Sequence, residues 1–325
     1  MKKSQFKGVL CLCIAAFVWG SSFVAQSIGM EKIEAFTYNG IRTLMGAATL
    51  LPIVLFREMK GAKKASRAGR KETSIGNRQV WAAGALMGLA LCVASNFQQF
   101  AFNYTTSGKI AFITALYMLF VPVFGLALGK KPPALIWGCI ALAAAGLYFL
   151  SIPAGGLTAL NRGDVLSLIC AAFFAVQILL VERYAGDNDP IMLSFVQFLV
   201  SGVISCALMF IFETPKIPQI NEAILPLLYS GVMSCGVAYT LQVVGQKYTE
   251  STLASLIMCA ESVFGVLSAA VILHEIPTGR EIAGCAMMLT AIVSAQMAGR
   301  AKKRPGSAEN WNLSLDATNS NEMNN

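Results

Sequence analysis

The sequence predicts an all-α integral membrane protein whose ten transmembrane helices form two inverted five-helix repeats. Of its 325 residues, 56% are hydrophobic and only 13% are charged, which is far more apolar than an ordinary soluble domain. Charge-poor apolar segments recur at about 20 residues, the length that crosses a bilayer as a helix. In addition, Gln98–Phe120 recurs at Gln242–Phe264 with six identities in 23 aligned residues. The chain therefore reads as a duplicated membrane bundle.

Apolar segments of this length define ten predicted spans, at 9–29, 33–56, 79–101, 110–129, 134–152, 164–181, 190–212, 223–245, 252–273 and 282–298. The first resembles a secretory signal because Lys2, Lys3 and Lys7 precede it. However, the uncharged stretch Gly8–Met30 is longer than the apolar core of a signal peptide, and nine further spans follow. We therefore expect a retained helix.

The two copies lie in separate blocks of five spans. Residues 1–152 form the first predicted repeat and residues 164–298 the second, while the polar stretch 299–325 is expected to be a disordered cytoplasmic tail. Because five is an odd number, the second block is inverted relative to the first in the membrane. Inverted repeats of this kind are an architecture of secondary transporters.

The basic residues predict the orientation of the chain. With a cytoplasmic N-terminus, nineteen of the 25 Lys and Arg residues fall on the cytoplasmic side, eight of them in the loop at 57–78. Five fall outside: Lys32, Lys109, Arg162, Lys216 and Arg280. This asymmetry follows the positive-inside rule, so the net charge of +8 requires no nucleic-acid partner. We expect a multi-pass protein of the cytoplasmic (inner) membrane, with both termini cytoplasmic and the basic loop near anionic lipid headgroups.

The sequence offers no set of metal or cofactor ligands. All nine cysteines fall within predicted spans, where they act as small packing residues, and no Cys-x-x-Cys pair occurs. The single histidine, His274, lies at the end of a span. We therefore expect no metal and no cofactor. The chain also lacks a Gly-x-x-x-x-Gly-Lys-Ser/Thr phosphate loop, so ATP is not the expected direct driving force.

Two charges lie near the middle of predicted spans, Arg42 in 33–56 and Glu261 in 252–273. A charge at the bilayer centre costs at least about 2.5–3.5 kcal/mol even on insertion scales, so such residues indicate function. Arg42 is expected to anchor an anionic group or a counter-ion, and Glu261 to couple to a proton or cation. Two structural alternatives remain, in which the two charges pair with each other or Arg42 snorkels outward.

Further polar and aromatic residues at membrane depth are expected to line a cavity with Arg42 and Glu261. They are Trp19, Asn96, Gln98, Tyr117, Gln177, Tyr239 and Gln242. Any single polar residue in a membrane helix can instead hold two helices together. The pair Gly84-x-x-x-Gly88 permits close packing within the bundle, and a homodimer is the alternative that it leaves open.

Several segments together carry a family resemblance that covers roughly residues 9–298. They are Ala16-Phe-Val-Trp-Gly-Ser-Ser-Phe23, Arg42, Tyr104-Thr-Thr-Ser107, Phe112-Ile-Thr-Ala-Leu-Tyr117, Val121-Pro-Val-Phe124, Tyr248-Thr-Glu-Ser251, Cys259-Ala-Glu-Ser-Val-Phe-Gly265, His274-Glu275 and Gly284. This constellation resembles the EamA-type ten-helix exporters of the drug/metabolite transporter (DMT) superfamily. The chain departs from the family pattern at Ser262, where a proline is usual, and at His274, where a glycine is usual.

The resemblance implies two inverted five-helix repeats around a central cavity, alternating access, and export of amino acids, metabolites or toxic compounds. It also implies that Trp19, Arg42 and Glu261 lie in or near that cavity. We therefore expect a secondary active transporter rather than an enzyme, an exporter of a small organic solute with proton coupling as one option. The alternatives are a membrane receptor or channel, and an enzyme of lipid metabolism, for which clustered acids or a His/Asp set at one interface would be expected.

Overall fold

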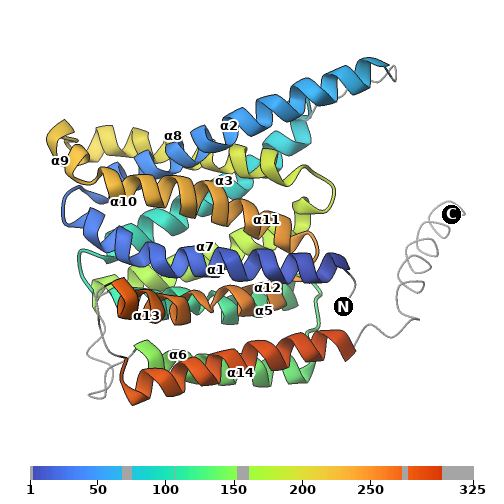
Figure 1. Ribbon diagram of the computed structural model, residues 1–325, viewed down its shortest axis with the longest axis vertical. Coiled ribbons are helices and arrows are strands. Elements are labelled where there is room, and N and C mark those ends of the chain that lie inside the picture. Colours follow the sequence, from blue (N-terminus) through green and yellow to red (C-terminus); the bar gives the residue numbers. More distant parts are fainter. Residues whose placement is uncertain (1–2, 68–74, 106, 152–160, 273–276, 302–325) are drawn as a thin grey trace, which may run out of the picture.

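The structure is a computed structural model that describes residues 3–67, 75–105, 107–151, 161–272 and 277–301. All regular secondary structure in these ranges is helical. The elements are α1 (Lys3–Met30), α2 (Ala35–Arg67), α3 (Arg78–Ala101), α4 (Ser107–Ala115), α5 (Tyr117–Ala127), α6 (Ala134–Ser151), α7 (Arg162–Ala185), α8 (Pro190–Phe212), α9 (Ile217–Glu222), α10 (Ile224–Leu228), the π-helix η1 (Tyr229–Tyr239), α11 (Thr240–Gln246), α12 (Ser251–Met258), α13 (Glu261–Ile272) and α14 (Gly279–Ala301). Most of them lie side by side along one direction (Figure 1).

Eight helical stretches within the described ranges are long and apolar enough to cross a membrane. They are Gln5–Met30, Ala35–Lys60, Arg78–Ala101, Lys109–Ala127, Arg162–Ala185, Pro190–Phe212, Ile224–Gln246 and Ser251–Ser268. The apolar helix at Ala134–Phe149 is shorter, and α14 is not among the eight. The prediction of an all-helical membrane protein is therefore confirmed, whereas the count of ten spans stays a prediction for α6 and α14.

Two of the predicted spans are interrupted by non-helical residues. The span at 110–129 is divided into α4 and α5 at Leu116, and the span at 252–273 into α12 and α13 at Cys259 and Ala260. At both breaks the backbone forms a 3₁₀-type hydrogen bond between residues three apart. These bonds run from Leu116 N to Ile113 O and from Ala260 N to Ile257 O, both at 3.2 Å. In the alignment of the two copies, Leu116 and Ala260 occupy the same position, so both copies break at one place.

A third predicted span, at 223–245, is helical from Ile224 onward but changes its winding. It consists of α10, η1 and α11, and η1 is eleven residues of π-helix. Such wide turns are rare and are frequently found at functional sites. The short helix α9, at Ile217–Glu222, precedes this span and was not predicted from the sequence.

Glycines allow the central helices to approach one another closely. A Cβ atom on Gly88 of α3 would lie 2.8 Å from the carbonyl oxygen of Gln197 in α8, and one on Gly84 would lie 2.6 Å from Val196 Cβ. The Gly84-x-x-x-Gly88 pair therefore packs inside the bundle. A Cβ on Gly20 of α1 would likewise lie 2.5 Å from the carbonyl oxygen of Glu261. This contact brings α1 against the break before α13.

Three helix ends that carry basic residues lie at one end of the bundle. The N-terminal end of α1, the C-terminal end of α14 and the far end of α2 lie at the same end in Figure 1, and α2 extends beyond its neighbours there. These are the ends that the charge distribution assigns to the cytoplasmic side.

Candidate functional site

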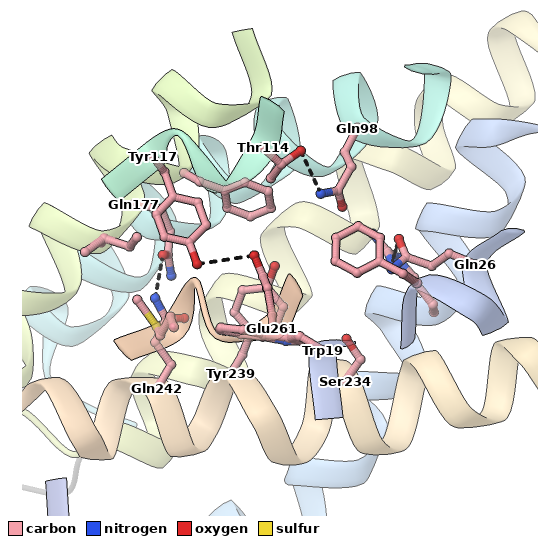
Figure 2. Close-up of a pocket in the computed structure, with 15 residues that line it drawn as sticks. Trp19, Gln26, Gln98, Thr114, Tyr117, Gln177, Ser234, Tyr239, Gln242 and Glu261 are labelled. Atoms are coloured by element: carbon pink, nitrogen blue, oxygen red, sulfur yellow. Dashed lines mark hydrogen bonds between the residues drawn. The ribbon is translucent and has the colours of Figure 1, made fainter. Parts of the chain in front are cut away.

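A central cavity lies where the two interrupted spans meet. It contains about 520 Å³ of empty space, including the part where it opens toward solvent. The cavity is lined by Trp19, Phe23, Gln26, Arg42, Gln98, Thr114, Tyr117, Phe174, Gln177, Ile178, Ser234, Tyr239, Gln242, Met258 and Glu261. Figure 2 shows that these side chains converge on it from both halves of the chain.

Eight of the nine residues predicted to form a cavity line this one: Trp19, Arg42, Gln98, Tyr117, Gln177, Tyr239, Gln242 and Glu261. The ninth, Asn96, is turned away from it. Its Nδ2 donates to Ser205 Oγ at 2.9 Å and its Oδ1 accepts from Asn39 Nδ2 at 2.9 Å. The amide of Asn96, on α3, therefore bonds to both α2 and α8 and does not face the cavity.

The two interruptions place Tyr117 and Glu261 opposite each other. Tyr117 is the first residue of α5 and Glu261 the first of α13, and they occupy aligned positions in the two copies. The Tyr117 hydroxyl donates to Glu261 Oε1 at 3.2 Å, as Figure 2 shows. Glu261 is only 5% exposed, and its position in the first turn of α13 places its carboxylate near the positive end of that helix.

Arg42 is held by neutral groups. Its Nε donates to Asn39 Oδ1 at 2.9 Å and its Nη1 to Gln26 Oε1 at 2.7 Å, while the guanidinium carbon lies 5.6 Å from the centre of the Tyr38 ring. The residue is 5% exposed, so it does not snorkel outward. Among the ion pairs of the described residues, none joins Arg42 to Glu261. The mutual pair that the sequence left open is not formed here.

Amide side chains form a chain along one wall of the cavity. Gln242 Nε2 donates to Gln177 Oε1 at 3.0 Å, and Gln177 Nε2 donates to Gln197 Oε1 at 3.2 Å. Gln242 Oε1 and the Trp19 indole Nε1 are buried and have no hydrogen-bond partner within the described ranges. Both atoms can therefore bond to a ligand or to water in the cavity.

Aromatic rings form another part of the wall. Trp19 and Tyr239 meet edge to face with their ring centres 4.7 Å apart, and Phe198 packs against Tyr239 from behind at 5.5 Å. Tyr239 is the last residue of η1. The wide π-helical turn therefore ends at a residue that lines the cavity.

Seven lining residues were not predicted from the sequence: Phe23, Gln26, Thr114, Phe174, Ile178, Ser234 and Met258. For four of them the sequence contains a pattern that could have identified them. Phe23 and Gln26 follow Trp19 at spacings of four and seven, which places all three on one helix face. Thr114 and Met258 occupy aligned positions of the two copies. Helical spacing combined with the repeat register would have located these four.

No group of three or more His, Cys, Asp or Glu residues that could hold a metal ion occurs in the part of the chain that the structure describes. His274 and Glu275 lie outside the described residues. The cavity thus offers one guanidinium, one carboxylate, amides and aromatic rings, which suit the binding of a small organic molecule.

The sequence model of the EamA-like transporter family matches residues 6–152 and again residues 161–295. The chain is similar to an uncharacterized transporter of Archaeoglobus fulgidus, with 29% identity over 286 residues, 87% of this chain and 84% of the relative. It is also similar to the uncharacterized transporter YwfM of Bacillus subtilis, with 23% identity over 300 residues, 90% of this chain and 95% of the relative.

A crystal structure shares the fold of this chain. The TM-score is 0.74 at 18% sequence identity, and the similarity covers 91% of this chain and 99% of the other. At that identity the match shows a common fold and carries no information about a ligand.

Proposed function

Because the chain belongs to the EamA-like transporter family, and with it to the DMT superfamily, we propose that it is a secondary active transporter. It moves small organic solutes such as amino acids, metabolites or drugs across the cell membrane by alternating access, in the direction of export. One observation carries the proposal, namely that the interruptions of two equivalent spans meet at the cavity through Tyr117 and Glu261. Interrupted helices at a repeat interface are where such transporters bind their substrates.

Reciprocal packing supports ten spans in two inverted repeats, 1–152 and 164–298. Helix α3 packs on α8 just as η1 packs on α2, and α4 and α5 pack on α7 just as α12 and α13 pack on α1. Helices α6 and α14 pack on each other and complete the two sets as the fifth spans. Two halves related in this way can exchange inward-open and outward-open arrangements. This architecture supports transport rather than catalysis.

The basic residues support one orientation of the transporter. Their clustering favours both termini on the cytoplasmic side of the inner membrane. Export is proposed from the family resemblance.

Glu261 is the proposed coupling residue. The titratable or charged side chains that line the cavity with it are Arg42, Tyr117 and Tyr239, and Glu261 is the only carboxylate among the lining residues. A carboxylate that faces alternate sides of the membrane in turn can carry a proton inward as the solute leaves. Its hydrogen bond with Tyr117 joins the two repeats, so proton binding at this position acts on both.

Efflux from proteoliposomes tests the proposal. Vesicles loaded with a labelled pool of amino acids and small metabolites should release a selected solute, and an imposed pH gradient should accelerate the release. Glu261→Gln should insert and fold but lose the acceleration. Glu250→Gln is a matched control, because Glu250 lies exposed at the start of α12 and outside the cavity.

The transport activity and the coupling role of Glu261 can be contradicted independently of each other. Release of no solute under any gradient would contradict transport. If the pH gradient still accelerates release by the Glu261→Gln variant, only the coupling role of Glu261 is contradicted.

A further inference from the structure

We infer that the cavity selects solutes that carry a negatively charged group such as a carboxylate, with Arg42 as its anchor and Asn39 and Gln26 as positioning residues. This inference rests on the proposed transport function and names the substrate class of the same cavity. It follows from the partners of Arg42, from the network behind them and from the different surroundings of Glu261.

Among the described residues, the buried charge of Arg42 forms no ion pair. Both of its hydrogen-bond acceptors, Asn39 Oδ1 and Gln26 Oε1, are neutral amide oxygens. The carboxylates of the described residues that form ion pairs do so with other cations. A buried cation without an opposite charge is unfavourable, especially at membrane depth. A solute that brings the missing negative charge would therefore bind with a large electrostatic advantage.

A second layer of contacts fixes the direction in which Arg42 points. Asn39 lies one helical turn before it, and its Nδ2 donates to Ser95 Oγ and Asn96 Oδ1, both at 2.9 Å. The Asn39 amide therefore cannot rotate without breaking bonds to α3, so its Oδ1 stays directed at Arg42 Nε. This assigns Asn96 to the support of the site rather than to its lining.

The contacts of Arg42 leave part of its guanidinium free for a ligand. A guanidinium has five N–H donors in a planar fork, and two of them are used by Asn39 and Gln26. The remaining donors include those on Nη2, and Arg42 lines the cavity. Two parallel N–H bonds to a carboxylate are the arrangement that this fork favours.

Glu261 does not create an equal demand for a cation. Its carboxylate accepts the Tyr117 hydroxyl bond and lies in the first turn of α13, where the helix dipole favours negative charge. Arg42 is the eighth residue of α2, beyond the first turn to which the helix-dipole effect is confined, and both of its hydrogen-bond acceptors are amides. The unmet charge of the cavity is therefore positive, and its ligand is negative.

The rest of the cavity limits the body of the solute. The aromatic rings of Trp19, Phe23 and Phe174 line it and favour a solute with a planar or apolar body. The Trp19 indole N–H is buried without a partner in the described ranges and can donate to a second acceptor. A small carboxylate with a planar or apolar body meets these requirements.

The test compares acids with their neutral amides, which have nearly the same shape. Binding of acetate, acetamide, phenylacetate and phenylacetamide to the purified full-length protein in detergent would be measured by titration calorimetry. At least one acid should bind about tenfold or more tightly than its amide, a ratio that corresponds to 1.4 kcal/mol. Equal binding of both members of each pair, or no binding of either acid, would overturn the inference without any mutant.

Substitutions show which residues cause the preference for acids over amides. Arg42→Gln should bring the acid-to-amide ratio close to one, and Arg42→Lys should leave an intermediate ratio because it keeps the charge and loses the fork. Asn39→Leu should lower the ratio while Arg42 is still present. Arg57→Gln is a matched control on the same helix, outside the cavity, and should leave the ratio unchanged.

Flux measurements separate this inference from the proposed function. If acids bind through Arg42 and no acid crosses the membrane under any gradient, the anion site stands and the transport proposal fails. If amides and acids are exported equally well, and Arg42→Gln changes neither, transport stands and the anion site is wrong.

Discussion

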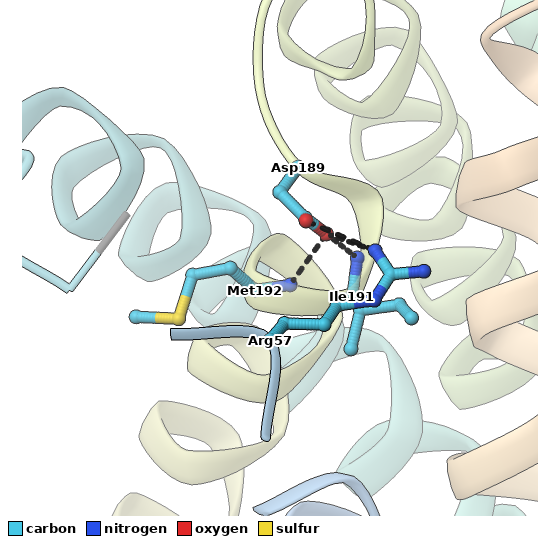
Figure 3. Close-up of polar contacts among 4 residues, drawn as sticks. All are labelled: Arg57, Asp189, Ile191 and Met192. Carbon is cyan, nitrogen blue, oxygen red and sulfur yellow. Dashed lines mark hydrogen bonds and ion pairs between the residues drawn. The ribbon is translucent and has the colours of Figure 1, made fainter. Parts of the chain in front are cut away.

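Arg42 and Arg57 lie on the same helix, α2, and have opposite surroundings. Arg42 is 5% exposed, faces the cavity and bonds only to neutral amides. The Arg57 side chain is 53% exposed, and its Nη1 lies 3.0 Å from Asp189 Oδ2. Figure 3 shows this pair beside the start of α8, where Asp189 Oδ1 also accepts the backbone N–H of Ile191. The charge of Arg57 is thus neutralised within the chain, whereas that of Arg42 is not.

Other charges near the membrane-spanning helices also divide into those with an oppositely charged partner and those with a neutral one. Lys109 pairs with Asp164 at 2.7 Å, and Lys130 pairs with Glu182, so α7 is tied to the interrupted first-copy span at both of its ends. Glu261, in contrast, has a tyrosine as its partner. A charge that only holds helices together is compensated inside the chain, because an uncompensated one would destabilise the fold. A charge with neutral partners can instead be compensated by a ligand, as proposed for Arg42, or by a proton, as proposed for Glu261.

Removing a compensated buried charge should have the largest effect on stability. In Lys109→Ala the Asp164 side chain, 1% exposed, loses its cation. Breaking a buried pair on one side costs about 3–5 kcal/mol, and thermal unfolding in detergent would measure the loss. The double variant Lys109→Ala with Asp164→Ala should recover part of it, because no charge then remains buried. Unchanged stability of Lys109→Ala would show that this pair does not hold the fold.

Removing the neutral partner of Glu261 should affect transport more than stability. Tyr117→Phe keeps the ring and deletes the hydroxyl that bonds to the carboxylate. This hydrogen bond joins the coupling residue to the other repeat, so gradient-driven efflux should fall roughly tenfold or more, about 1.4 kcal/mol of activation free energy. Tyr104→Phe is the control, since Tyr104 is 49% exposed and lies outside the cavity. Equal efflux in both variants would remove Tyr117 from the coupling proposal.

The smallest effect is expected at Arg57. An exposed ion pair contributes at most about 1 kcal/mol, so Arg57→Gln should shift the unfolding temperature slightly and leave efflux unchanged. The measurement is efflux of the selected solute beside that of Arg42→Gln. A large loss of transport in Arg57→Gln would break the comparison, because a compensated charge would then also serve transport.

Much of the fold and part of the site could be predicted from local features of the sequence. A span is recognised by its length and lack of charge, and Arg42 and Glu261 by the cost of a charge within such a segment. Most polar residues chosen for their depth, such as Gln98 and Gln242, do line the cavity. Asn96 was chosen by the same rule and lies behind it, because depth does not determine which way a side chain faces.

By itself, the sequence determined the membrane-embedded helical class, the duplication and the depth of the two charges, since each depends on one segment and the bilayer around it. Only the tertiary structure decided that Tyr117 meets Glu261, that Gln26 and Asn39 hold Arg42, and that both copies break at aligned positions. The physical reason is that Tyr117 and Glu261, and likewise Gln26 and Arg42, belong to different helices, while Asn39 is itself oriented by hydrogen bonds to α3. These partners are fixed only when glycine contacts and ion pairs set which helix faces pack together.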